Sequence, residues 1–212
     1  MVEQETKTGT TTVALVCKDG IVLAADKRAT SGYLISWKKF DKIMPINDNI
    51  AVTVAGNVSD VQLLVKYLKA ELKLKDIRTG RDSSVREASS LLANFVYSNI
   101  RNYSIIPGIS HFIMAGKDSQ GLHLYDISPD GSIVQIDDYI SSGSGSVMAF
   151  GVLETLYREG LSVDEGVKLA AKCVNAAVQR DIASGNGIDI VTVTKDGVKK
   201  VYSKKLEMKI EL

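Results

Sequence analysis

The sequence contains few of the residues that most often bind metals or form covalent cross-links. Cys17 and Cys173 are its only cysteines, and His111 and His123 are its only histidines. Two distant cysteines without a C-x-x-C motif predict neither a disulfide framework nor a zinc site, so we expect both to be reduced core residues. Neither histidine lies in a Ser-His-Asp pattern, and there is no G-x-S-x-G motif. The sequence therefore predicts no metal or cofactor, and no histidine-based hydrolase.

An excess of one charge and long hydrophobic runs are missing as well. The 26 Lys and Arg residues nearly balance the 25 Asp and Glu residues, so the net charge of +1 favours neither nucleic acid nor an anionic membrane. No apolar run reaches about 18 residues, so no membrane helix is predicted. The first nine residues, MVEQETKTG, lack the apolar stretch of a signal peptide, and we expect a cytoplasmic protein. A length of 212 residues suits one globular domain.

What the sequence does contain is a clear order of strand and helix patterns. Apolar residues three and four apart predict helices, and short β-branched runs next to Asp-Gly turns predict strands. Strands are expected at 11–17, 21–25, 33–37, 43–46, 50–55, 111–116, 122–127, 133–136, 188–194 and 198–202. Helices are expected at about 59–74, 84–103, 147–159 and 163–183. Residues 203–212 are expected to form a tail or an edge strand.

This order predicts the fold class. Strands come first, then two helices, strands, two helices and strands, which differs from the regular alternation of a doubly wound parallel sheet. Two runs, IVLAA and IAVTVA, are apolar on both faces, as strands are when another sheet covers one face and helices the other. We therefore predict an α+β fold in which two mostly antiparallel sheets stack, with a helix pair on each outer face.

The stretch KTGTTTVALV places three threonines directly after Gly9. Threonine is common in strands, which is the simplest explanation for the run. A second explanation is catalytic: a chain that began at Thr10 would carry an α-amine with an ordinary pKa of about 7.7–8.0. Such an amine can be neutral near pH 7 and act as the base for the hydroxyl of the same residue. This chemistry requires removal of residues 1–9, and Gly9 has no side chain to obstruct attack on its carbonyl.

The start of the chain, TGTTTVALVCKDGIVLAADKRAT, resembles a proteasome β subunit of the simple archaeal or bacterial type. The segments KFDKI, VAGNVSDVQLLVKYLKAEL, SSGSGSVMAFGVLE and VDEGVKLAAKCVNAAVQRDIASGNGIDI extend the resemblance over essentially the whole chain. The resemblance implies a four-layer αββα sandwich, the fold of N-terminal-nucleophile hydrolases, and a threonine endopeptidase. It also implies that residues 1–9 are a propeptide removed by autocleavage and that residues 10–212 form one catalytic domain.

The resemblance also implies a role for each matching residue. Thr10 would be the nucleophile, Lys42 the cation beside it, and Asp26 the carboxylate that holds this lysine. Gly56 would supply the backbone N–H of the oxyanion hole. The residues implied to support the free amine are Ser144, Asp181 and Ser184.

Substrate and partners follow from the same resemblance. Unfolded polypeptide would pair with backbone near Thr30 and Gly56, as an added strand. The implied pocket for the residue before the cleaved bond is apolar, which predicts hydrophobic specificity; its residues are Ala29, Met44, Val54 and Val58. The family works without a metal or cofactor, in heptameric β rings that stack face to face between rings of α subunits.

Other interpretations remain open from the sequence. The chain could be a noncatalytic β subunit of the ring, or one that is processed only when a second type of β subunit is present. A related amidase acting on a small molecule is a third possibility, against which the long match outside the site argues. Taken alone, GSGS is more typical of a flexible connection, RDIASG of a helix end, and Asp26 of a turn at the end of a strand.

Overall fold

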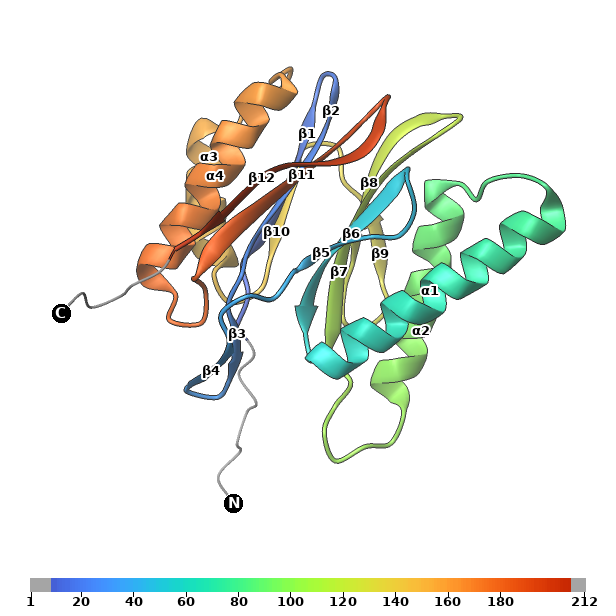
Figure 1. Ribbon diagram of the computed structural model, residues 1–212, viewed down its shortest axis with the longest axis horizontal. Coiled ribbons are helices and arrows are strands. Elements are labelled where there is room, and N and C mark those ends of the chain that lie inside the picture. The colour runs from blue at the N-terminus through green and yellow to red at the C-terminus, as the bar shows by residue number, and fades with distance from the viewer. Residues whose placement is uncertain (1–8, 207–212) are drawn as a thin grey trace.

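The computed structural model describes residues 9–206, and these form two five-stranded antiparallel sheets that face each other (Figure 1). The strand order is β10-β1-β2-β11-β12 in one sheet and β5-β6-β7-β8-β9 in the other. The strands of the first sheet are β1 Thr12–Cys17, β2 Gly20–Asp26, β10 Tyr139–Ser142, β11 Gly187–Thr194 and β12 Gly197–Lys205. Those of the second are β5 Ile43–Pro45, β6 Ile50–Gly56, β7 Ser110–Asp118, β8 Gly121–Ile127 and β9 Ile133–Gln135. A separate hairpin joins β3 Ala29–Ser31 to β4 Leu34–Trp37.

A helix pair covers the outer face of each sheet, as Figure 1 shows. Helices α1 Val58–Thr79 and α2 Val85–Arg101 pack on the β5–β9 sheet, whereas α3 Ser146–Leu156 and α4 Val163–Arg180 pack on the other. Capping boxes start α2 and α4, because Ser84 and Ser162 each accept a bond from a glutamate amide three residues on. The predicted α+β sandwich, with a helix pair on each outer face, is therefore confirmed.

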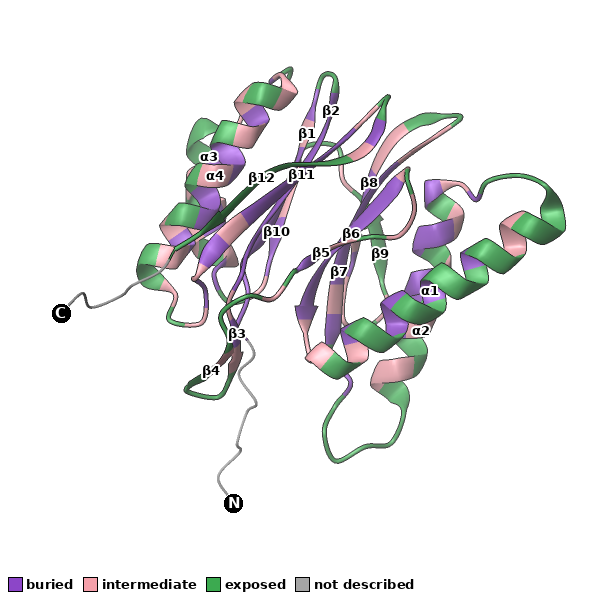
Figure 2. Ribbon diagram, viewed as in Figure 1, coloured by how far each residue is buried: buried purple, intermediate pink, exposed green. Residues whose placement is uncertain are grey.

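Three buried clusters form the core, one for each contact between layers. Alternation along β6 shows the arrangement: Val52 and Val54 pack against α1 and α2, whereas Ala51 packs in the cluster between the sheets. Strand β2 is buried along its whole length (Figure 2). Both cysteines are free and buried, as expected from the sequence. Within residues 9–206 no helix has the length and apolar character needed to cross a membrane.

The structure corrects several predicted boundaries. Helix α1 continues to Thr79, five residues beyond the prediction, and α4 ends at Arg180, three residues before it. Strands β3 and β10 were not predicted. β10 is short and rich in serine, and it is stabilised by pairing with β1, in which Thr12 lies opposite Ser142. Of the expected tail or edge strand, residues 203–205 complete β12, and residues 207–212 lie outside the described part of the chain.

Candidate active site

Several strands of both sheets terminate at the same end of the sandwich. Strand β2 ends there at Asp26, and Thr10 directly precedes the segment that starts β1. The second sheet contributes Gly56, the last residue of β6, which pairs with Ser110. This end of the sandwich therefore collects residues that are far apart in the sequence, including Thr10, Asp26, Lys42 and Gly56.

Asp26 is a fully buried carboxylate with a full set of donors. Its Oδ1 accepts bonds from the Thr11 amide at 2.9 Å and from Lys42 Nζ at 2.6 Å. Its Oδ2 accepts from the amides of Arg28 and Gly185, both at 2.9 Å. Four donors, one of them charged, therefore satisfy both oxygens of this carboxylate in the interior.

Lys42 is among the largest fully buried side chains of the described chain. Burial lowers the pKa of its ammonium group, and the Asp26 carboxylate 2.6 Å away opposes that shift. The ammonium group also donates to the carbonyl oxygen of Gly9 at 3.2 Å. Lys42 therefore connects the buried carboxylate to the peptide bond between Gly9 and Thr10.

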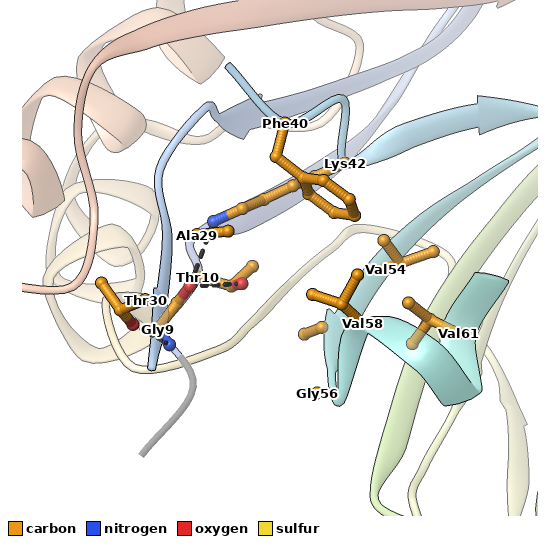
Figure 3. A pocket seen from close by; sticks show the side chains of 11 residues that line it. Gly9, Thr10, Ala29, Thr30, Phe40, Lys42, Val54, Gly56, Val58 and Val61 are labelled. Carbon is orange, nitrogen blue, oxygen red and sulfur yellow. Dashed lines mark hydrogen bonds between the residues drawn. The ribbon is translucent and has the colours of Figure 1, made fainter. Parts of the chain in front are cut away.

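The carbonyl of Gly9 receives two donors. Thr10 Oγ1 donates to the carbonyl oxygen at 2.7 Å, beside the bond from Lys42 (Figure 3). A Cβ atom added to Gly9 would lie only 1.7 Å from the Cβ of Ala183, so only glycine fits this position. The threonine hydroxyl and the lysine ammonium group thus both bind the carbonyl oxygen of the peptide bond that would have to be cut.

A second cluster of polar side chains contacts the amide nitrogen of Thr10. The Thr10 amide donates to Ser144 Oγ at 3.3 Å, and Ser144 Oγ donates to Asp181 Oδ2 at 2.6 Å. Ser184 Oγ donates to the same carboxylate oxygen at 2.6 Å and also lies 2.6 Å from the Thr11 hydroxyl. Ser144, Asp181 and Ser184 therefore form one hydrogen-bonded cluster around the nitrogen that becomes the amine if the chain is cut.

Two backbone positions at the site require glycine. Gly143 has φ of 90°, and a Cβ there would lie 2.1 Å from the Thr10 carbonyl oxygen. Gly56 has φ of 117°, and a Cβ there would lie 2.2 Å from the carbonyl oxygen of Ile109. Gly56 also lines the same cavity as Thr10, with no side chain between its backbone and an entering substrate.

The cavity beside Thr10 has a mostly apolar lining. Ala29 from β3, Val54 from β6 and Val58 from the start of α1 line it, and the Thr30 hydroxyl accepts a bond from the Gly9 amide at 3.0 Å. Met44 does not line this cavity in the described chain, and it packs instead against the core under α1 and α2.

Three cavity residues and one supporting residue were not predicted. Phe40, Ala55 and Val61 complete the apolar lining, and Figure 3 labels Phe40 and Val61. Arg28 donates through Nε to Asn186 Oδ1 at 2.8 Å and through a terminal nitrogen to the Ile182 carbonyl at 2.6 Å, so it holds the loop that carries Ser184. The sequence feature that could have pointed to Phe40 and Arg28 is their position: Phe40 lies two residues from Lys42, and Arg28 lies two residues from Asp26.

No group of three or more His, Cys, Asp and Glu side chains within residues 9–206 is arranged to hold a metal ion. What the site offers is a hydroxyl, a paired ammonium group, backbone N–H groups and a carboxylate–serine cluster. Such a set suits attack by the hydroxyl on a carbonyl, with charge on the oxygen stabilised by nearby donors.

Comparison with known proteins gives consistent matches. A family model described as proteasome subunit matches residues 6–193. A proteasome subunit beta from Haloferax volcanii is 45% identical over 196 residues, which are 92% of this chain and 78% of the relative. The proteasome subunit beta of Methanothermobacter thermautotrophicus is 42% identical over 212 residues, covering 100% of this chain and 99% of the relative. That of Archaeoglobus fulgidus is 42% identical over 92% of this chain and 90% of its own.

Proposed function

This chain belongs to the proteasome subunit family as a β subunit of the core particle, and we propose that it is a catalytic subunit with Thr10 as its nucleophile. The proposed activity is that of a threonine endopeptidase that degrades unfolded polypeptides. Residues 1–9 would be a propeptide that the chain removes itself, and residues 10–212 would form the catalytic domain; residues 1–8 and 207–212 lie outside the described residues.

One observation carries the proposal: Thr10 Oγ1 and Lys42 Nζ both donate to the carbonyl oxygen of Gly9, at 2.7 and 3.2 Å. A carbonyl that receives two donors, one of them charged, is polarised for attack. The attacking hydroxyl belongs to the next residue, so it needs only a rotation toward the carbonyl carbon. A structural role alone gives no reason to direct the ammonium group of a buried lysine at this particular peptide bond.

Self-cleavage would proceed in two steps. Thr10 Oγ bonds to the Gly9 carbonyl carbon while the amide C–N bond breaks, and the hydroxyl proton ends on the departing nitrogen. The resulting ester links Gly9 to the Thr10 oxygen. Water then hydrolyses the ester, which restores the hydroxyl, releases residues 1–9 as a carboxylate and leaves Thr10 with a free α-amine.

Cleavage of a substrate would use the same residues with the amine as base. The amine takes the hydroxyl proton as Thr10 Oγ attacks the substrate carbonyl, and the Gly56 N–H stabilises the oxyanion. The adjacent Lys42 cation disfavours protonation of the amine and so lowers its pKa. Ser144, which already contacts this nitrogen, and Asp181 behind it orient the amine. The intermediate then collapses: the substrate C–N bond breaks, the departing amine takes the proton from the Thr10 amine, and an ester to Thr10 Oγ remains. Water hydrolyses this ester, again with the amine as base.

The geometry of the cavity supports hydrophobic specificity. Ala29, Phe40, Val54, Val58 and Val61 line it, and none of them carries a charge. We propose that the side chain before the cleaved bond is apolar and enters here. As in its family, the subunit would act in the cytoplasm, inside rings formed with other β subunits and with α subunits.

The test is the intact mass of the subunit after co-expression with its α partner. We expect the parent chain to lose residues 1–9, the Thr10→Ala variant to keep them, and a Thr155→Ala variant to behave like the parent. Thr155 is an exposed residue of α3 whose hydroxyl bonds only within its helix, so it controls for loss of a threonine. A parent that stays at full length would contradict the proposal and favour a structural subunit, or one that requires another β subunit.

A further inference from the structure

Next to the proposed catalytic ion pair lies a second set of buried charges, centred on Lys27. Lys27 and Asp189 are each only 2% exposed, and the Lys27 ammonium group donates to Asp189 Oδ2. Burial disfavours the charged form of Asp189, but bonds from Lys27, Ser203 and Lys200 hold its pKa below the ordinary value. Nothing in the proposed chemistry uses either Lys27 or Asp189, so this buried pair needs another explanation.

The charged residues of the two strand ends are paired crosswise. The dipeptide Asp26-Lys27 ends β2, and the dipeptide Asp41-Lys42 precedes β5. Lys42 Nζ bonds to Asp26 at 2.6 Å, and Lys27 Nζ bonds to Asp41 at 3.4 Å. The lysine of each dipeptide therefore pairs with the aspartate of the other. These two ion pairs join the end of β2 to the residues that precede β5.

Lys27 holds the segment before Lys42 at a second point. The Phe40 amide donates to the Lys27 carbonyl at 3.0 Å, so both the backbone and the side chain of Lys27 bind residues 40 and 41. The other end of this segment is fixed where Val54 N donates to the Lys42 carbonyl at 2.9 Å. Residues 38–42 have no regular hydrogen-bonded structure, so these contacts set the position of the Lys42 backbone.

Lys27 is itself fixed by the first sheet. Asp189 belongs to β11, and its Oδ1 faces Lys200 of β12 at 3.1 Å. A Cβ added to Gly187 would lie 3.0 Å from Lys27 Cδ, so the glycine leaves room for the lysine stem. The four charges Lys27, Asp189, Asp41 and Lys200 sum to zero and connect the edge of the sheet to the segment that carries Lys42.

We propose that Lys27 is a positioning residue: its crossed ion pair with Asp41, supported by Asp189, holds the Lys42 ammonium group at the reacting bond. This inference rests on the proposed function of Lys42. The other charged groups that influence the Lys42 ammonium group are Asp26, Asp181 and Arg28. Without the crossed pair, the segment that carries Lys42 would shift and its ammonium group would act less strongly on the Thr10 amine.

The most direct test is Asp41→Ala, because the Asp41 side chain is 63% exposed and its removal leaves no buried charge without a partner. The matched control is Lys39→Ala, an exposed lysine of the same segment. In assembled particles we expect Asp41→Ala to lower kcat for a short apolar peptide about tenfold with KM nearly unchanged, since small displacements of catalytic groups have large effects. The acid limb of the pH profile should move to higher pH, because a more distant cation lets the Thr10 amine hold its proton longer.

A second variant pair tests Lys27 itself. Lys27→Gln should show the same loss of kcat and the same shift of the pH profile, and Lys27→Arg should restore both in part. If Lys27→Gln fails to assemble, Asp41→Ala still tests the inference, because it removes only the contact between Lys27 and the segment that carries Lys42. Kinetics of Asp41→Ala equal to those of Lys39→Ala would overturn the inference.

A third measurement does not depend on activity. In the Thr10→Ala background, crystal structures should show the contact between Lys42 Nζ and Asp26 Oδ1 lengthened by Asp41→Ala and unchanged by Lys39→Ala. An unchanged contact in both would overturn the inference, whereas an inactive parent particle would overturn only the proposed function. The two failures are therefore distinguishable.

Discussion

The two ends of the sandwich differ in where their charged residues lie and in how far along the chain the partners of those residues are. At the end opposite the site, tight turns join β1 to β2, β7 to β8 and β11 to β12, and their charged residues lie mostly at the surface. At the site end, Asp26 and Lys42 are buried, and Lys42 lies 16 residues along the chain from the carboxylate it binds. The Thr10 nitrogen finds its partner, Ser144, 134 residues away.

Because of this difference, substitutions at the two ends should affect stability and the proposed chemistry to different extents. A turn at the far end is held chiefly by residues close to it in sequence, so a change there should alter the free energy of unfolding and little else. A change at the site end removes a partner from a buried charge, so it should affect both stability and the proposed cleavage of the Gly9–Thr10 bond. The following four substitutions test this separation.

The largest effect is expected from Lys42→Met. Removing the ammonium group leaves the Asp26 carboxylate buried with amide donors alone, which should cost about 3–5 kcal/mol of stability. Loss of a charged donor at the Gly9 carbonyl should also slow self-cleavage at least about 100-fold. Intact mass against time and the thermal midpoint of the particle measure the two effects.

The control for Lys42→Met is Lys75→Met. Lys75 pairs with Glu87 at 2.7 Å, but both side chains are about one-third exposed. Solvent screens such a pair, so its loss should change stability by less than about 1 kcal/mol and leave self-cleavage at the parent rate. If Lys75→Met lowered stability and slowed self-cleavage as much as Lys42→Met, buried charges at the site end would have no special role.

Gly9→Ala should rank second. A methyl group at residue 9 would collide with the Ala183 side chain, so the Gly9 carbonyl must move away from Thr10 Oγ1 and Lys42. We expect self-cleavage to slow about tenfold or more, with little change in the stability of the particle. The double variant Gly9→Ala with Ala183→Gly should recover much of the rate. Gly151→Ala, in an open position of α3, should cleave normally.

At the far end, Gly20→Ala should act on stability alone. A Cβ on Gly20 would lie 2.6 Å from Val163 Cγ2 and 2.9 Å from the Val193 carbonyl oxygen, so neighbouring groups must shift. Overpacking of this kind costs about 1–3 kcal/mol. The thermal midpoint of the particle should fall, while peptidase activity per correctly processed subunit stays at the parent value. A fall in kcat would show that the far end is coupled to the site.

The smallest effect is expected from Ser84→Ala, also near the far end, where the Val85 amide donates to Asp118. The Ser84 hydroxyl accepts a bond from the Glu87 amide at 3.2 Å and so caps α2. Loss of the cap should cost about 1 kcal/mol, and self-cleavage should be unaffected. Thermal unfolding beside the Ser84→Asp variant, which retains a capping oxygen, would show whether the cap is responsible.

The same difference explains what could be predicted from the sequence. Helical spacing and Asp-Gly turns act over a few residues, so the order of the helices and of most strands was predicted, as were the turns that join β1 to β2 and β11 to β12. Strand β10 was missed because its stability comes from pairing with β1, more than 120 residues away. At the site, the chemistry of an N-terminal threonine could be argued from the residues themselves. The grouping of Ser144 with Asp181 and Ser184 could not, because local patterns suggest a flexible loop and a helix end.

The hydrogen bond between the Thr10 amide and Ser144 has a consequence for how activity would be withheld. Many inactive precursors are folded differently from their active forms and must rearrange. Here the Thr10 nitrogen of the uncleaved chain already lies 3.3 Å from the serine proposed to orient the free amine, and Lys42 Nζ already donates to the Gly9 carbonyl that is proposed to react. Latency would then reside in a single covalent bond, and maturation would be a change of bonding at one atom without a change of shape.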